Sequence, residues 1–164
     1  MARKILIYSL LSLLLIVLDS TLVKFLAIAT IVPDILLIWI VYVAIREGQA
    51  TATTTGFLIG LAENLMGTMN GVLGLAALAK TFAGFIAGYF FNENKIETNL
   101  GGYQFIVIVS VASLVHNSVY FLIFLQGSGL SWSQSLLYYG IPTTAYTAIV
   151  ALVPMFAFAR KYLS

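Results

Sequence analysis

The sequence predicts an all-α membrane protein, a six-transmembrane-helix bundle that forms a single integral membrane domain over residues 1–164. Of its residues 61% are hydrophobic and 9% are charged, whereas a soluble domain carries about a quarter charged residues. The mean hydropathy is +1.02, and apolar stretches recur at close to the roughly 20 residues that cross a bilayer as a helix. Basic residues cluster beside alternate stretches, which is the pattern that orients multi-pass membrane proteins.

Six apolar stretches are candidate spans, and the connections between them are too short to hold a soluble domain. They run near 5–22, 34–45, 50–66, 72–91, 104–125 and 141–159. The first begins with basic residues, as a signal peptide does, but only a poor cleavage site follows, so we expect a retained first span. The second stretch is short, and Pro33 is expected either to begin its helix as the first helical residue or to kink a longer one.

The positively charged residues divide unevenly between the two sides of the membrane. If both termini face the cytoplasm, six basic residues lie inside: Arg3, Lys4, Arg46, Lys95, Arg160 and Lys161. Only Lys24 then lies outside, and Lys80 falls within a span. The positive-inside rule favours this arrangement over a five-span count, which would separate the two basic termini. We therefore predict that the termini and Lys95 are cytoplasmic and that Ser128 is outside.

The outer segment before the last span has features of a short helix at the membrane surface. Ser131 and Gln134 have the spacing of a capping box, and Trp132 is a residue type enriched at membrane interfaces. Gly140 is expected to end this helix and Pro142 to open the last span. The alternative is an irregular loop that contains aromatic residues by chance.

Polar residues within or near the apolar stretches are the main candidates for a site. A charge at the centre of a bilayer costs about 2.5–3.5 kcal/mol on insertion scales, so such residues usually face protein or water. Four ionisable residues and one amide fall in the middle or outer part of the membrane: Asp19, Glu63, Asn64, Lys80 and His116. We expect Glu63 to lie near Lys80 across a short turn. Whether the residues form one buried polar cluster or are each satisfied separately stays open.

Two glycine pairs are candidates for close helix packing. Gly56 and Gly60 in the third stretch, and Gly84 and Gly88 in the fourth, have the G-x-x-x-G spacing that lets helices approach in lipid. At least one pair is expected to pack these helices within the chain, although the motif is common in membrane helices.

The residue inventory argues against an enzyme. The sequence has no cysteine and one histidine, which excludes thiol chemistry and any site that needs two histidines. It contains no phosphate-binding loop and no G-x-G-x-x-G motif, and its aspartates do not form an intramembrane pair. We expect no catalytic residues, no cofactor, no metal site and no binding of nucleic acid.

The stretch from Val32 to Lys80 resembles a known family, the rod-shape-determining membrane protein MreD. "VPDILLIWIVYVAIREG" and then "TGFLIGLAENLMGTMNGVLGLAALAKT" match its Pro-Asp helix start, its G-F-x-x-G-x-x-x-D-L-x-S-G segment and its L-G-x-x-A-L segment. The matching residues are Pro33, Asp34, Gly56, Phe57, Gly60, Leu65, Leu73, Gly74, Ala77 and Leu78. Two places depart from the family: Asn64 stands where it often has Asp, and Gly67–Thr68 replaces Ser-Gly.

The resemblance implies a non-catalytic scaffold of the bacterial cell-elongation (rod-shape) machinery in the cytoplasmic, or inner, membrane. Its partners would be MreC and, through MreC, the RodA glycosyltransferase with its penicillin-binding transpeptidase, which synthesise peptidoglycan, and indirectly the cytoskeletal MreB. Membrane lipid would surround it. The resemblance also implies a fold similar to the six-helix substrate-binding subunits (S-components) of vitamin transporters.

A substrate-binding membrane subunit of a vitamin transporter is the alternative function. The outer polar residues would then form its site, and Trp132 would contribute an aromatic surface. The motif match favours the scaffold. The sequence leaves open whether a lipid or small ligand is bound, which helix face contacts MreC, and the oligomeric state.

Overall fold

The chain folds into a bundle of helices, seen in a computed structural model that describes residues 2–21, 23–28, 31–66, 74–125 and 131–163. The elements in chain order are α1 (Ala2–Thr21), the 3₁₀ helix η1 (Val23–Leu26), α2 (Ile35–Glu47), α3 (Gln49–Met66), α4 (Leu75–Gly88), the 3₁₀ helix η2 (Glu93–Lys95), α5 (Ile96–Gly101), α6 (Tyr103–Phe124), α7 (Trp132–Ser135), the π-helical turn η3 (Leu136–Gly140) and α8 (Ile141–Leu163). Within these ranges the one β-type pairing is an isolated bridge between Ile28 and Ile31. The predicted all-α class is confirmed.

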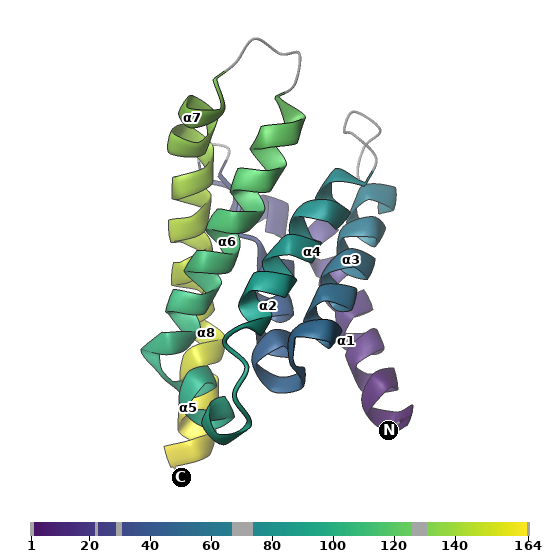
Figure 1. Ribbon diagram of the computed structural model, residues 1–164, viewed down its shortest axis with the longest axis vertical. Helices are drawn as coiled ribbons and strands as arrows, with labels where there is room; N and C mark the ends of the chain where they lie inside the picture. Colours follow the sequence, from purple (N-terminus) through teal and green to yellow (C-terminus); the bar gives the residue numbers. More distant parts are fainter. Residues whose placement is uncertain (1, 22, 29–30, 67–73, 126–130, 164) are drawn as a thin grey trace.

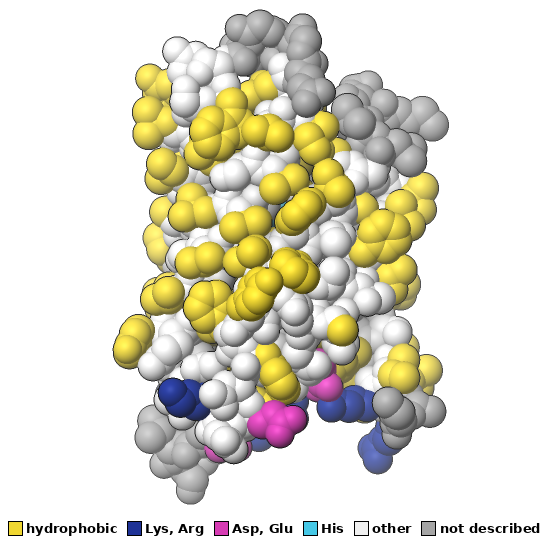
Figure 2. All heavy atoms as spheres, viewed as in Figure 1, with side chains coloured by type: hydrophobic (Ala, Val, Ile, Leu, Met, Phe, Trp, Pro, Cys, Tyr) yellow, Lys and Arg dark blue, Asp and Glu magenta, His cyan; other side chains and the backbone are white. Residues whose placement is uncertain are grey.

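The helices run along the long axis of the molecule, and α1 begins at the same end at which α8 finishes (Figure 1). Charged side chains gather at this end, and hydrophobic side chains cover the middle of the face shown in Figure 2. A cleft at the charged end is lined by Lys4, Arg46, Glu47 and Glu93, which come from three separate parts of the chain. The charged end and the apolar belt have the distribution expected of a protein embedded in a bilayer.

Three of the described helices are long and apolar enough to cross a membrane. They are Arg3–Thr21, Tyr103–Phe124 and the continuous helix Trp132–Lys161. A fourth crossing is present if α4 is counted together with η2 and α5, a pair bent by 85°. Because α2 and α4 have 13 and 14 residues, each is only about 20 Å long. The number of crossings is therefore three or four by length and composition, and the count of six stays a prediction.

Pro33 neither opens α2 as its first helical residue nor kinks a longer helix, so both expectations for it are wrong. It lies just before Asp34, which is the N-cap with an extended backbone and a side chain that accepts a hydrogen bond from Leu37 N. A carboxylate is among the best N-cap groups and begins the helix without help from proline. The preceding chain forms η1, so no longer helix runs through Pro33.

The predicted surface helix before the last span is not a separate element. The chain continues without a break from α7 through η3 into α8, and Gly140 lies inside this helix instead of ending it. Ser131 occupies the N-cap but makes no side-chain cap hydrogen bond, so the capping box is not formed. Pro142 has no N–H to donate to the preceding turn, and a π-helical turn at this point accommodates that loss. Ser128, predicted to lie outside, is beyond the described residues.

The centre of the bundle is formed by α2, which contacts α1, α3, α4, α6 and α8. Five of its side chains are completely buried: Leu37, Ile40, Val41, Ala44 and Ile45. Phe105 and Val109 of α6 join the same core from the other side. By contrast, α1 buries only Ile16 among its described side chains and exposes most of its leucines.

Helices α3 and α4 make the closest helix contact of the bundle, and all four glycines of the two pairs lie in it. A Cβ atom on Gly60 would lie 2.5 Å from Ala77 Cα, and one on Gly84 would lie 2.6 Å from the carbonyl oxygen of Ala52. Cβ atoms on Gly56 and Gly88 would meet the backbone of Lys80 and of Gln49. Both pairs therefore pack α3 against α4, where the sequence required only one of them to do so.

We predict that Gly60→Leu destabilises the protein strongly because its side chain would collide with the α4 backbone, which cannot move aside as a flexible side chain can. Overpacking typically costs about 1–3 kcal/mol, and backbone contact places this variant at or above the upper end. Ala50→Leu, at an exposed position of the same helix, is the matched control. Thermal unfolding in detergent measures both. Equal stability of the two variants would contradict the packing described here.

Candidate functional site

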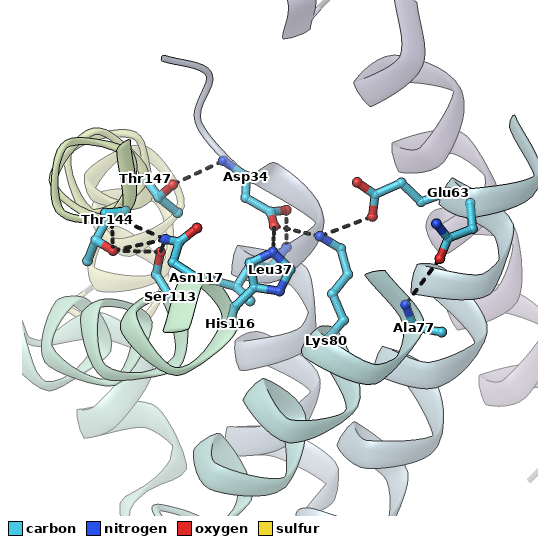
Figure 3. Close-up of polar contacts among 12 residues, drawn as sticks. Asp34, Leu37, Glu63, Ala77, Lys80, Ser113, His116, Asn117, Thr144 and Thr147 are labelled. Atoms are coloured by element: carbon cyan, nitrogen blue, oxygen red, sulfur yellow. Dashed lines mark hydrogen bonds and ion pairs between the residues drawn. The ribbon is translucent and has the colours of Figure 1, made fainter. Parts of the chain in front are cut away.

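Lys80 lies at the centre of a group of polar side chains inside the bundle (Figure 3). It is on α4, only 1% exposed, and its Nζ atom lies 2.5 Å from Asp34 Oδ2 and 3.1 Å from Glu63 Oε2. The first contact is a hydrogen-bonded ion pair, and the second is an ion pair without hydrogen-bond geometry. An ammonium group this deeply buried requires such partners, because desolvation would otherwise make its charge very unfavourable.

Asp34 connects three helices through one residue. Its Oδ1 atom caps α2 by accepting from Leu37 N at 2.8 Å, while Oδ2 binds Lys80 on α4. Its backbone N–H donates to Thr147 Oγ1 on α8 at 3.0 Å. The start of α2 is thus fixed to both α4 and α8. The sequence placed Asp34 at a helix end but did not identify it as the main partner of Lys80.

His116 on α6 closes the group on the side opposite Glu63 (Figure 3). Its Nε2 atom lies 3.8 Å from Asp34 Oδ2, and its imidazole stacks against Tyr120 with ring centroids 6.1 Å apart. The Nδ1 atom is buried and has no hydrogen-bond partner of acceptable geometry. An imidazole nitrogen left in this way is uncommon and costs stability, so it marks a place where the bundle is not optimised for folding alone.

A second set of polar contacts joins α6 to α8. Asn117 Nδ2 donates to the carbonyl oxygen of Gly140 at 3.2 Å and to Thr144 Oγ1 at 3.2 Å. Ser113 Oγ donates to the same threonine at 3.1 Å. These contacts hold the π-helical turn against α6. Sequence reasoning missed them, although two polar residues four positions apart in an apolar helix would share one face and would have indicated them.

Asn64 contacts a different partner from Glu63, because the side chains of neighbouring residues point about 100° apart around a helix axis. Its Oδ1 atom accepts from Ala77 N at 3.4 Å, which is one of the free N–H groups in the first turn of α4. Asn64 therefore acts as a capping residue supplied by the neighbouring helix. It does not touch the group around Lys80.

A cavity of about 610 Å³ opens beside Asp34, Glu63 and His116. Its wall includes Asp19 from α1 and aromatic residues from α6 and η3. The full lining is Asp19, Val32, Pro33, Asp34, Glu63, Ser113, His116, Asn117, Tyr120, Phe121, Phe124, Leu125, Ser135, Tyr139 and Thr143. In the described part of the chain no group of three or more His, Cys, Asp or Glu residues is arranged to hold a metal ion.

The structure brings together three of the five polar residues that the sequence singled out. Glu63, Lys80 and His116 meet around Asp34, and the predicted approach of Glu63 to Lys80 is present. Glu63 is not fully buried, since 37% of its side chain is exposed towards the cavity side of the bundle. Asp19 lies on the cavity wall, and Asn64 is separate. The two glycine pairs lie in the α3–α4 contact.

Comparison with known proteins gives no further assignment. No family model matches the chain, no curated protein matches it significantly, and no solved structure does so. The family resemblance and the likeness to vitamin-transporter subunits therefore stand on the motif residues alone.

The two carboxylates around Lys80 are predicted to differ in their contribution to stability. Asp34→Asn removes the closest charge partner of a completely buried ammonium and should lower the free energy of unfolding by about 3–5 kcal/mol. Glu63→Gln leaves Lys80 and Asp34 as a neutral pair, and Glu63 is partly exposed, so its loss should cost under about 1 kcal/mol.

Chemical or thermal unfolding of the detergent-solubilised variants measures this difference. Equal destabilisation by Glu63→Gln and Asp34→Asn would contradict the role of Asp34 as the principal charge partner of Lys80. Leu58→Ala, at an exposed position of α3, controls for general effects of substitution on this helix.

Proposed function

We propose that this chain is a non-catalytic membrane scaffold of the MreD type, which binds MreC in the bacterial inner membrane and supports peptidoglycan synthesis during cell elongation. The observation that carries the proposal is structural. Asp34, Gly56, Gly60 and Ala77, four of the residues on which the resemblance rests, lie in the contacts that hold α2, α3 and α4 together. A chance match would not be expected to select residues that contact one another across three helices.

Three of these residues meet where α3 ends and α4 begins. Gly60 packs against Ala77, and Asn64 accepts a hydrogen bond from Ala77 N. Gly74 occupies the N-cap of α4 with a φ of 91°, a conformation that favours glycine. Where the family often has Asp, this chain has Asn, and both side chains are strong capping acceptors. The departure at Asn64 thus preserves the chemistry of the position.

The other end of the matching stretch closes the same unit. Asp34 belongs to the Pro-Asp helix start, and Lys80 ends the stretch 46 positions later; the two form the shortest ion pair described. Their pairing brings the first and last parts of the resemblance into contact inside the bundle. This supports the view that the stretch is one structural unit, as a family motif would be.

The proposal includes six crossings by α1, α2, α3, α4, α6 and α8, with both termini in the cytoplasm. It is supported by the position of the α1 start and the α8 end at one end of the molecule (Figure 1). It is also supported by the Lys and Arg side chains that lie at that same end (Figure 2). The short helices α2 and α4 would cross within the protein interior, where neighbouring helices surround them.

Cysteine labelling tests this topology. The chain has no native cysteine, so single cysteines can be introduced freely. Lys95→Cys is expected to be protected from a membrane-impermeant thiol reagent in intact cells, whereas Ser133→Cys, at an exposed outer position, is expected to react. Labelling of both sites after cell lysis is the control. Reaction at position 95 in intact cells would overturn the orientation.

The surface available to a partner consists of lipid-facing helix sides and outer connections. Both glycine pairs are used within the chain, so neither is open to another helix. Helix α1 exposes a row of large apolar side chains, with Leu6 66%, Leu10 67% and Leu13 67% exposed. Helix α8 exposes a second row that includes Val153 and Phe156. These two faces can receive a single-span helix such as that of MreC without any change in the core.

We predict that the purified protein binds MreC, and that tryptophan substitutions on one of these two exposed rows reduce the binding. Leu10→Trp samples α1 and Val153→Trp samples α8. Neither side chain packs in the core, so the fold should be unaffected, and unfolding temperature serves as the control. Co-purification from detergent and from nanodiscs measures the binding. Absence of any MreC binding by the unmodified protein would reject the scaffold.

The substrate-binding subunit of a vitamin transporter is the second candidate, and the cavity beside Asp34 favours it. Its volume of about 610 Å³ is within the range of small-molecule sites. The two functions separate by experiment: a transporter subunit would retain a vitamin at stoichiometric amounts through purification and would not bind MreC. The motif residues favour the scaffold because several of them lie in the contacts between α2, α3 and α4, whereas among those described Pro33 and Asp34 line the cavity.

A further inference from the structure

The cavity beside Asp34 carries chemistry that the scaffold function does not use. A scaffold needs only a packed core and an outer surface. This bundle instead keeps an open space of about 610 Å³ with carboxylates, hydroxyls, an imidazole and four aromatic rings on its wall. Filling such a space with apolar side chains would stabilise the fold, because packing and burial both favour it.

Two carboxylates of its polar wall share one cation. Asp34 and Glu63 both line the cavity and both pair with the buried ammonium of Lys80. Lys80 directs its hydrogen bond to Asp34, and the buried oxygen Oε2 of Glu63 has no hydrogen-bond partner. Because 37% of the Glu63 side chain is exposed beside the cavity, its carboxylate favours a ligand with a positively charged donor.

Two other polar groups of the wall, Asn117 and Ser113, do not supply this donor. The amide nitrogen of Asn117 donates to Gly140 and Thr144, and the hydroxyl of Ser113 donates to Thr144. These donors are used between α6 and α8. An anion would also meet the carboxylates of Asp34 and Glu63.

The aromatic rings add a second reason for a cation. Tyr120 stacks on Phe124 with centroids 5.5 Å apart and meets Phe121 edge to face at 5.7 Å. Tyr139 from η3 completes the wall, 6.4 Å from Phe121 and 51% exposed. Aromatic faces next to carboxylates are the environment in which organic ammonium groups bind by cation–π attraction. Metal ions prefer several oxygen ligands at once, and the described residues hold no such set.

We propose that this cavity binds an organic ammonium group, with Glu63 as its charge partner and with Tyr120 and Tyr139 against its alkyl substituents. The group comes either from the headgroup of an amine-bearing phospholipid or from a free small amine, since both present the same chemistry. Glu63 receives the ammonium through the exposed part of its carboxylate, while its Oε2 atom and Asp34 remain paired with Lys80. The proposal does not depend on the scaffold function, since it concerns a face of the chain apart from the exposed rows of α1 and α8.

The first arm of the test uses the full chain in detergent with n-butylamine and with n-butanol, a neutral molecule of similar shape. Thermal stabilisation as a function of concentration gives the apparent Kd of each probe. We expect stabilisation by n-butylamine only. A charged hydrogen bond contributes roughly 1.5–3 kcal/mol, so Glu63→Gln should weaken n-butylamine binding about tenfold or more. Glu97→Gln, an exposed carboxylate in α5 at the charged end, should leave it unchanged.

A second variant keeps the proposal testable if Glu63→Gln does not fold. Tyr139→Leu keeps an apolar side chain at an exposed position and removes only the aromatic face, so we expect the fold to persist and binding to weaken severalfold. The proposal is wrong if n-butanol stabilises as well as n-butylamine, if no amine stabilises, or if both Glu63→Gln and Tyr139→Leu bind n-butylamine as the unmodified protein does.

The second arm identifies the source of the ammonium. The protein is placed in nanodiscs of phosphatidylethanolamine or of phosphatidylglycerol, and the lipids retained after extraction are counted by native mass spectrometry. Preferential retention of phosphatidylethanolamine that is lost in Glu63→Gln assigns the site to a lipid headgroup. Equal retention of the two lipids together with n-butylamine binding assigns it to a free amine. Equal retention without n-butylamine binding overturns the proposal.

Discussion

The burial of one ammonium group, that of Lys80, constrains most of the arrangement of this bundle. A lysine that is 1% exposed in the middle of an apolar helix needs carboxylates at contact distance, and it obtains them from α2 and α3. Because Asp34 also caps α2 and binds Thr147, the same requirement fixes where α2 begins and how it meets α8. Four helices are thereby positioned by one charge and the groups that neutralise it.

The glycine contact between α3 and α4 makes this geometry possible. Gly56 lies against the backbone of Lys80 itself, so α3 approaches α4 at the position of the buried charge. A larger residue there would separate the helices and move Glu63 away from the lysine. The close contact and the ion pair thus support each other: the first sets the distance between the helices, and the second fixes their register along the axis.

Sequence reasoning predicted the parts of this structure that depend on local pattern. The helical class, the position of most helices, the glycine contact and the approach of Glu63 to Lys80 follow from hydrophobic runs, G-x-x-x-G spacing and a short turn. The role of Asp34 could not be deduced, because its partner is 46 positions away and α2 had to be placed first. The continuity of α7 into α8 was missed because Gly140 and Pro142 usually mark a boundary, whereas here Asn117, on another helix, binds the Gly140 carbonyl and supports a π-helical turn.

Hydrogen bonding differs between the interior of the bundle around Lys80 and Asp34 and the wall of the cavity. The side chains of Lys80 and Asp34 are paired with each other, and the aliphatic core of α2 lies beside them. On the cavity side, Glu63 Oε2 and His116 Nδ1 are buried without hydrogen bonds. Unsatisfied buried groups reduce stability, and they persist in a fold when another interaction compensates for them. Because Lys80 and Asp34 are paired, the fold can retain a wall on which the Glu63 and His116 atoms lack hydrogen bonds. The buried polar atoms without hydrogen bonds are therefore a feature of the cavity wall, and they do not imply that the whole bundle is unstable.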